Sequence, residues 1–339
     1  MTVEIEIAKK EDRKRWNQLI SESIYNSIFH IWEWLEIAEK YTKSRLYPIV
    51  SYRGEEPIGV FPIFYKKKFG LKMTFSPPPS TAMGFLGPII LNYEKIKEDK
   101  RLYYLSEFQK KVDNFIFSDL DSSYALFFLH PILKDCRSFK WTNYRIEPVF
   151  HYMLDLTPGP GFLWQQFKKE LRENVKKSKK KGVYFEEGEK EDLLLIYESL
   201  VERYKEQNKI VQISKNYLLD LYNLFYPKNL RIFVAKKNGE FLTGIIALCF
   251  KDTIYFWIGG TKAGLKSLYP NDLLHWEAIK WACEHGYKYY VEFGAGTERL
   301  ARFKSKFNPN LIVCFSARKY STFFVRLLES LYGKVRIKL

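Results

Sequence analysis

Two stretches of the chain, LYPIVSYRGEEPIGVFPIFY (residues 46–65) and RIFVAKKNGEFLTGIIALCF (residues 231–250), match each other at a constant offset. Each stretch contains an apolar run, a turn with the dipeptide Gly-Glu, and a second apolar run. β-type runs joined by a short glycine-bearing turn are typical of an antiparallel hairpin. The sequence therefore predicts one hairpin in each half of the chain, and hence an internal duplication.

The glycines of the two hairpins have the same spacing. Gly54 and Gly239 lie in the turns, where the positive φ of a tight hairpin favours glycine. Gly59 and Gly244 lie in the return strands, where a glycine indicates a bulge or a close approach of another segment. Equal spacing in both copies supports one structural unit used twice.

The elements after each hairpin also correspond. They are expected, in the first and then the second copy, as a glycine-bearing strand (81–90; 253–260), a helix (103–116; 271–285) and an apolar strand (124–131; 287–296). This order predicts an α+β fold in two tandem units. The Pro/Gly cluster LTPGPG, residues 156–161, breaks regular structure. We therefore expect an N-terminal domain over 1–157 and a C-terminal domain over 158–339.

The composition limits the functional class. The chain has 339 residues, 46% of them hydrophobic, and a formal net charge of +16. So much apolar material excludes wholesale disorder, and the charge favours an anionic partner such as nucleic acid or a phosphorylated substrate. The four cysteines lack metal-ligand spacing, and no metal site is expected. No apolar run approaches the ~18 residues of a membrane span. We expect a cytoplasmic protein without an integral membrane segment, and a monomer as the simplest state.

A basic segment, FLWQQFKKELRENVKKSKKKG (residues 162–182), opens the second half. Its apolar residues recur every four positions and predict a helix with one narrow buried stripe. The candidate polyanion-binding residues on its other faces are Arg172, Lys176, Lys177, Lys180 and Lys181. Lysines of this density suit phosphate contacts, although a charged run is also the ordinary face of a solvated helix.

The stretch VEFGAGTERLARFKSKFNPN (residues 291–310) carries the candidate catalytic chemistry. Glu292 lies within an apolar strand, where burial would raise its pKa and suit it to be a general base for an attacking amine. The alternative is an outward-facing carboxylate paired with Lys288 or Arg302. Gly294 and Gly296 follow the strand and would let a ligand approach the backbone.

Three segments carry a resemblance to a known family. They are FKKELRENVKKSKKKGVYFEEG (167–188), YPNDLLHWEAIKWACEHGYKYYVEFGAG (269–296) and RFKSKF (302–307). Together with the order of elements, they resemble the GNAT acyltransferase fold, duplicated as in the Fem family of tRNA-dependent aminoacyl transferases. The resemblance implies two tandem GNAT-like domains, with the active site in the second.

The resemblance also implies where the substrates bind. The strands at 253–259 and 289–294 would splay apart, and the acyl donor would enter between them. Lys304 would lie near the acyl carbonyl and stabilise an oxyanion. The expected substrate or donor contacts are Arg302, Phe303, Gly294, Gly296, Tyr269 and Asn271. Asn271 opens a helix, where amides attract anions, although a helix cap is its plainer role.

Two functional hypotheses follow. The first is an N-acyltransferase that moves an acyl group from acyl-CoA or aminoacyl-tRNA directly to an amine, with no tightly bound cofactor. The second is a non-catalytic nucleic-acid-binding protein that retains the fold, with tRNA or another phosphate-rich partner. The basic helix supports both hypotheses, whereas Lys304 and the glycines near it favour the first.

Overall fold

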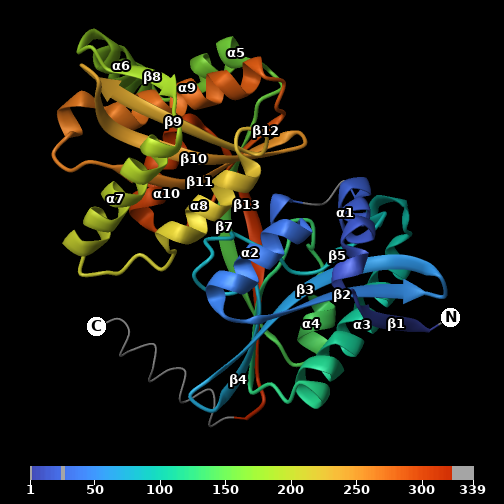
Figure 1. Ribbon diagram of the computed structural model, residues 1–339. Helices are drawn as coiled ribbons and strands as arrows, with labels where there is room; N and C mark the ends of the chain where they lie inside the picture. The colour runs from blue at the N-terminus through green and yellow to red at the C-terminus, as the bar shows by residue number, and fades with distance from the viewer. Residues whose placement is uncertain (1, 24–26, 323–339) are drawn as a thin grey trace. The chain divides into compact units, whose positions relative to one another are not determined.

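The computed structural model describes residues 2–23 and 27–322, and these form two compact units (Figure 1). One unit contains the residues up to Val149 together with those from Val313. The other is Phe150–Ile312. Each unit is a mixed sheet covered by helices, which confirms the predicted α+β class.

The units divide the chain differently from the expected boundary between 157 and 158. The part of β7 (Arg145–Asp155) from Tyr152 to Asp155 pairs with β12 (Tyr289–Glu292) of the second unit. Conversely, β13 (Asn310–Tyr320) pairs with β6 (Tyr124–Phe128) of the first unit. Each unit thus contains a strand from the end of the other half of the chain. A strand's unit is decided by its ladder partner, which chain order does not reveal.

The first unit has the strand order β1-β2-β3-β4-β6-β13. The remaining bounds are β1 (Val3–Ile7), β2 (Arg45–Arg53), β3 (Glu56–Lys68), β4 (Leu71–Ser76) and the short β5 (Ile89–Ile90), with α1 (Arg13–Glu22), α2 (Trp32–Thr42), α3 (Glu98–Asn114) and α4 (Arg137–Trp141). The third strand was expected at 81–90. That expectation is wrong, because β4 takes the place beside β3 and most of 81–90 is a loop.

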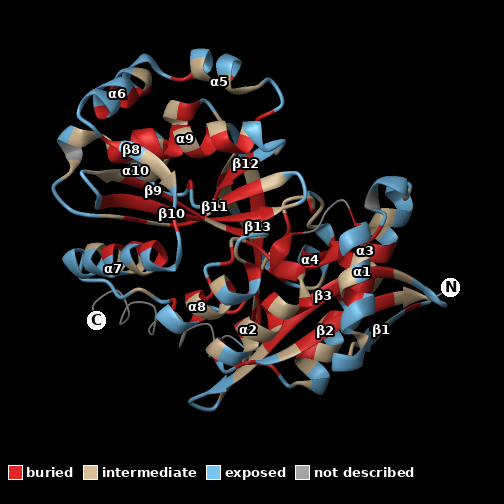
Figure 2. Cartoon of the chain, turned by 45° about the horizontal axis from the view of Figure 1, so that its top comes forward, coloured by how far each residue is buried: buried red, intermediate tan, exposed pale blue. Residues whose placement is uncertain are grey.

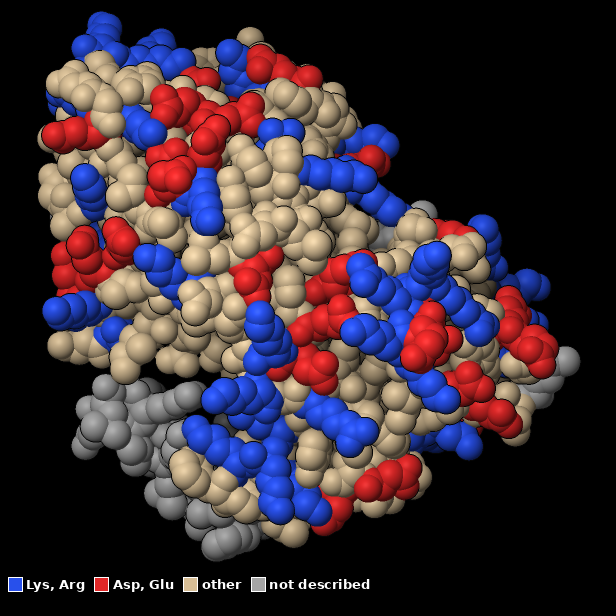
Figure 3. Space-filling view, viewed as in Figure 1, with Lys and Arg blue, Asp and Glu red and all other residues tan. Residues whose placement is uncertain are grey.

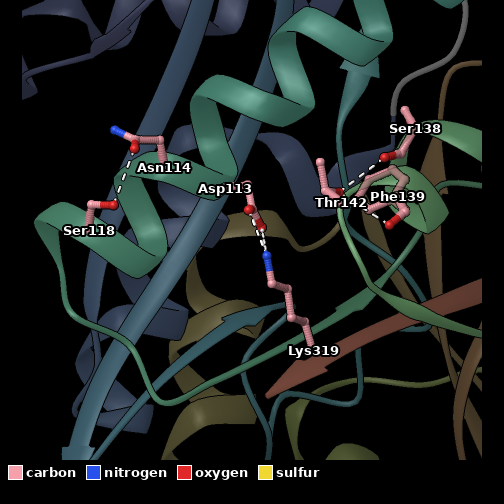
Figure 4. A network of polar contacts seen from close by, with 7 residues as sticks. All are labelled: Asp113, Asn114, Ser118, Ser138, Phe139, Thr142 and Lys319. Atoms are coloured by element: carbon pink, nitrogen blue, oxygen red, sulfur yellow. Dashed lines mark hydrogen bonds and ion pairs between the residues drawn. The ribbon is translucent and has the colours of Figure 1, made fainter. Parts of the chain in front are cut away.

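A half-buried ion pair ties the last strand to helix α3 in the first unit (Figure 4). The ammonium of Lys319 on β13 lies 2.7 and 2.9 Å from the carboxylate oxygens of Asp113 on α3. The same ammonium lies 4.5 Å from the ring centroid of Phe117 and 5.5 Å from that of Tyr144. The pair therefore links segments that are far apart in the sequence.

The second unit has the order β7-β12-β11-β10-β9-β8, in which only the β11–β12 pair is parallel. Its remaining strands are β8 (Tyr184–Glu187), β9 (Leu230–Lys237), β10 (Glu240–Phe250) and β11 (Thr253–Thr261). Its helices are α5 (Pro160–Gln166), α6 (Lys169–Lys180), α7 (Lys190–Glu206), α8 (Lys215–Phe225), α9 (Pro270–Glu284) and α10 (Glu298–Lys304). The single basic helix expected over 162–182 is two helices, because Phe167 is extended (ψ 148°).

Both predicted hairpins are present. The β2–β3 turn closes at Arg53 and Glu56, and the β9–β10 turn closes at Lys237 and Glu240. The two turn glycines have positive φ, as expected: 62° for Gly54 and 80° for Gly239. The glycines of the return strands are sites of close packing. A Cβ at Gly59 would lie 2.9 Å from Phe108, and one at Gly244 would lie 2.5 Å from Ile196.

Helix α7 packs directly on the sheet at Gly260 of β11. A Cβ at this glycine would lie 2.1 Å from the backbone oxygen of Ile196 on α7. Figure 2 shows the strands largely buried, whereas the outer faces of the helices are exposed. The glycine therefore lets the helix backbone approach the sheet.

We expect Gly260→Ala to destabilise the protein by about 2 kcal/mol or more, because the backbone atoms it meets cannot move aside as a side chain could. Chemical denaturation measures this change. Gly161→Ala is the matched control, because a Cβ at Gly161 meets nothing within 4 Å. Equal stability of the two variants would contradict the close approach.

Candidate active site

The parallel strands β11 and β12 separate at one point in the second unit. Their pairing ends at Phe256 and Glu292. Beyond it, β11 continues to Thr261 alongside β10, whereas the chain after β12 bonds to β7 through Ala295 N–H and the oxygen of Phe150. The splay implied by the family resemblance is therefore present, and Glu292 lies where it begins.

Glu292 belongs to a buried cluster of three ionisable side chains. His275 Nδ1 lies 2.8 Å from Glu292 Oε1, and Lys304 Nζ lies 3.6 Å from Glu292 Oε2. The side chains of all three are at most 7% exposed. The His275 nitrogen is close to the carboxylate but lacks hydrogen-bond alignment.

Lys304 is held by the end of the strand. Its ammonium donates a short hydrogen bond to the oxygen of Phe293 and a longer one, 3.5 Å, to that of Gly294. The lysine comes from the last residue of α10, which brings it back onto the strand that precedes this helix. Lys304 is thereby buried, with 6% of the residue exposed.

Aromatic rings fix the position of His275. The ring stacks on Phe256 at 4.6 Å and 15°, and the edge of Phe303 approaches it at 5.1 Å. Phe307 lies 5.4 Å away on another side. Phe303, expected to contact substrate, instead packs against the histidine. Rings on both β11 and the α10 segment thus orient the imidazole toward Glu292.

The charges in the cluster determine its ionisation. Burial opposes the ionised form of Glu292, but the neighbouring His275 and Lys304 outweigh burial and hold the pKa of Glu292 below its ordinary value of 4.5. The raised pKa expected from the sequence is therefore wrong. Burial lowers the pKa of Lys304, and Glu292 offsets part of that effect. Glu292 is consequently ionised at neutral pH.

A small cavity of about 10 Å³ adjoins the cluster, which is about the space of one water molecule. Its lining residues are Tyr152, Leu154, Ile279, Tyr290, Glu292, Lys304, Phe307 and Pro309. Lys304 thus faces this cavity together with residues of β7, β12 and α9.

Lys288 and Arg302, the two partners considered for Glu292 from the sequence, each form an ion pair with another carboxylate. Lys288 pairs with Asp252 at 2.8 Å, and Arg302 pairs with Glu298 at 2.6 Å on the exposed side of α10. The outward-facing interpretation of Glu292 is therefore wrong. Arg302, one of the expected substrate contacts, lies on the surface with its side chain 80% exposed.

The two glycines after β12 are exposed. Gly294 has a φ of 77°, and its N–H donates to His151 Nδ1 at 3.2 Å. A Cβ would meet nothing within 4 Å at either Gly294 or Gly296. Their backbone is therefore exposed to solvent near the point where β11 and β12 separate.

Asn271 and Tyr269 lie at the start of α9. The carboxamide oxygen of Asn271 accepts hydrogen bonds from the hydroxyls of Thr243 (2.7 Å) and Thr261 (3.0 Å), so it ties α9 to β10 and β11. Tyr269 precedes the helix with a φ of 51°. Asn271 is therefore not the helix cap considered from the sequence.

The basic residues of α6 are not equivalent. Lys176, Lys177 and Lys180 are exposed, whereas Arg172 is half-buried. Lys181 donates to the oxygen of Ser267 at 2.7 Å, close to Tyr269. Only part of the predicted polyanion set is thus available as a free cationic face.

An open groove of about 350 Å³ adjoins this face. It lies between α5, α6 and α9, and its lining residues are Pro160, Gly161, Trp164, Val175, Lys176, Lys179, Trp276 and Lys280. The tryptophan rings lie 4.7 Å apart. Sequence reasoning missed this groove, because α5, α6 and α9 meet only in the fold.

Sequence reasoning also missed a buried polar pair, formed by Asp272 and Asn174. Asp272 accepts a hydrogen bond from Asn174 of α6 at 2.7 Å, and burial raises the pKa of Asp272. The only available signal was that Asp272 and His275 share a helix face.

Among residues 2–23 and 27–322, no cluster of His, Cys, Asp and Glu is arranged to hold a metal ion. None of the helices described there is long and apolar enough to cross a bilayer.

We expect Glu292→Gln to destabilise the protein by about 3 kcal/mol at neutral pH, because it leaves Lys304 buried without its counter-charge. The folded-state pKa of Glu292 lies below 4.5, so its contribution is present above that pH and is lost as the pH falls through the folded value. The difference in stability between wild type and variant should therefore shrink in acid. Denaturant titrations across the pH range measure it.

Glu298→Gln is the control for this prediction. Glu298 forms an exposed pair with Arg302, and such pairs add little stability. Its removal should change stability little at any pH. A pH-independent effect of Glu292→Gln would show that the carboxylate is not ionised in the folded protein.

Comparison with known proteins shows what this chain is similar to. Residues 165–305 match the model of an acetyltransferase (GNAT) domain. No curated protein matches the sequence significantly. The fold is similar to the crystal structure of FemX, with a TM-score of 0.67 and 12% identity, covering 93% of this chain and 96% of FemX.

Two further solved structures have the same fold. A tandem GNAT protein from the clavulanic acid biosynthesis pathway has a TM-score of 0.56 and 9% identity, with 94% and 99% of the two chains covered. The C-terminal domain of a putative lysylphosphatidylglycerol synthetase from Agrobacterium fabrum has a TM-score of 0.55 and 13% identity, with 91% and 92% covered. Residues 165–305 are therefore similar to an acetyltransferase (GNAT) domain, and the chain shares its α+β fold, with two tandem GNAT-like units, with FemX and the tandem GNAT protein.

Proposed function

We propose that this protein is an N-acyltransferase that moves an acyl group from acyl-CoA or aminoacyl-tRNA directly to an amine. The observation that carries the proposal is a buried ammonium, Lys304, held at the point where β11 and β12 separate. A splayed strand pair gives a donor access to backbone groups, and a nearby cation can stabilise the charge that develops on an acyl oxygen.

Lys304 is the proposed oxyanion donor. Its contacts with Gly294 and Glu292, at 3.5 and 3.6 Å, are long. The N–H that points toward Gly294 can therefore be shared with a new acceptor while Glu292 continues to balance the charge. The amine attacks the acyl carbon, a C–N bond forms, and the bond to the sulfur or oxygen of the carrier breaks. The amine nitrogen loses one proton, and the departing carrier atom takes one.

Glu292 is proposed to position Lys304 rather than to remove the amine proton. Its pKa is lowered, which makes it a weak base at neutral pH. An ionised carboxylate between His275 and Lys304 instead fixes the ammonium and keeps it protonated despite burial. His275 lies against the other carboxylate oxygen of Glu292 and helps to hold that carboxylate in place.

The proposed contacts of the donor are the exposed groups near the splay. Gly294 and Gly296 offer backbone, and Arg302 offers a solvated cation. Tyr269 adjoins the start of α9 on the same unit. Asn271 and Phe303 are proposed to act through packing, because their side chains are already engaged.

The basic face of α6 is proposed to bind the phosphates of the donor's carrier. Lys176, Lys177 and Lys180 are exposed, and Lys176 borders the groove that contains Trp164 and Trp276. Cations beside aromatic rings suit a nucleotide. The same face supports the second candidate, a nucleic-acid-binding protein without catalysis.

The proposal has four further parts. The acceptor is an amine, the protein is cytoplasmic, it is a monomer, and it has no tightly bound cofactor.

We expect Lys304→Met to reduce transfer by about 10²-fold or more, because it removes the oxyanion donor and keeps the apolar stem. The assay supplies acetyl-CoA, or separately aminoacyl-tRNA, with a panel of amines and measures release of the free carrier. Lys288→Met is the control, since Lys288 is exposed and pairs with Asp252. Circular dichroism must show that both variants are folded at the assay temperature.

Two results would count against the proposal. Wild-type turnover in folded Lys304→Met would remove this residue from the mechanism. No transfer by wild type from either donor, together with tight RNA binding, would favour the non-catalytic candidate.

Reversing the charge of Lys176, Lys177 and Lys180 to Glu should abolish polyanion binding, because these lysines form the exposed cationic face of α6. Fluorescence anisotropy with labelled tRNA measures it. The wild-type affinity should fall with salt with a log–log slope of about −0.7 per single-strand phosphate contact. Lys262→Glu is a single-charge control elsewhere in the unit. Binding that is independent of salt would contradict the electrostatic basis.

A further inference from the structure

The β3–β4 hairpin of the first unit extends beyond its neighbouring strands. The last partner of β2 on β3 is Tyr65, and the pairing of β4 with β6 begins at Met73. Between these points, Lys66, Lys67 and Lys68 pair only with the opposite arm of the hairpin. The hairpin end therefore projects from the sheet.

Phe69 occupies the turn of this hairpin in an unusual state. It is 85% exposed, and its φ is 51°. With Gly70 at 77°, both turn residues are left-handed, as in a type I′ turn, where Asn or Gly is the preferred first residue. Single exposed apolar residues are ordinary. A bulky ring in a left-handed turn, however, is favoured neither by conformation nor by burial.

Lysines surround the ring on both arms. Lys66, Lys67 and Lys68 precede it and Lys72 follows it. Lys72 pairs with Asp121, and Lys66 donates to the oxygen of Thr42, but among the described residues no carboxylate pairs with Lys67 or Lys68. Burial lowers the pKa of Lys66, and the charges of Lys68 and Lys43 lower it further. In Figure 3, Lys and Arg side chains gather in the lower part of the view, where Figure 1 draws this hairpin.

We propose that the β3–β4 hairpin docks on an anionic lipid bilayer, with Phe69 in the interface and Lys67 and Lys68 at the headgroup phosphates. An apolar group at the extreme tip, with cations set behind it, matches the order of acyl chains and phosphates at a membrane surface. A nucleic acid fits less well, because Phe69 has no hydrogen-bonding group and the tip has no arginine to read bases. This docking goes beyond the proposed acyl transfer and does not depend on it.

Co-sedimentation with vesicles tests the proposal on the full chain. One set of vesicles is phosphatidylcholine alone, and the other contains one-third phosphatidylglycerol. Wild type should bind the anionic vesicles and not the neutral ones, and the binding should weaken with salt. Phe69→Asn should reduce binding about tenfold, the effect of losing one inserted aromatic side chain. Lys67→Glu with Lys68→Glu should reduce it by about tenfold or more.

The design separates docking from folding. Asn is favoured in a left-handed turn, so Phe69→Asn should melt at the same temperature as wild type or higher. Trp141→Gln, which removes another exposed aromatic side chain of this unit, should bind vesicles as wild type does. Wild-type vesicle binding by Phe69→Asn, absence of a preference for anionic vesicles, or loss of RNA binding in place of lipid binding would overturn the proposal.

Discussion

The buried contact of Lys304 with Glu292 is the interaction on which the second unit's site depends. Burying either charge alone is costly, and each is tolerated because the other is there. The pair joins the end of α10 to the end of β12, and His275 adds α9 to the same point. Three elements that would otherwise diverge where β11 and β12 separate are thereby held together.

This arrangement links stability to chemistry. A splayed strand pair exposes backbone groups that a regular ladder would use internally. At this splay, the ammonium of Lys304 uses the carbonyl oxygens of Phe293 and Gly294, so the end of the strand remains satisfied without a neighbouring strand. The same ammonium lies 3.5 Å from the oxygen of Gly294, one of the two exposed glycines. The side chain of Lys304 thus both supports the strand end and carries the proposed catalytic role.

The pairing of the terminal strands sets a second constraint. The strand from the end of each half, β7 or β13, completes the sheet of the other unit. The Asp113–Lys319 pair then anchors β13 within the first unit (Figure 4). Folding of the first unit therefore requires a distant part of the chain, whereas the second unit is the continuous segment Phe150–Ile312.

Local chemistry in the sequence determined the repeated hairpins, the helix at 270–284 and the α+β class, because turn glycines and apolar periodicity act over a few residues. The turn positions of Gly54 and Gly239, and the close packing at Gly244, could be predicted in this way. Lys304 and the strand splay came from resemblance to a family. Three features were decided only by the tertiary structure: the partner of β13, the ionised state of Glu292 and the engagement of Asn271 by two threonines. Each depends on residues that are far away in the chain, and the energy of a buried charge or a strand edge depends on which groups surround it.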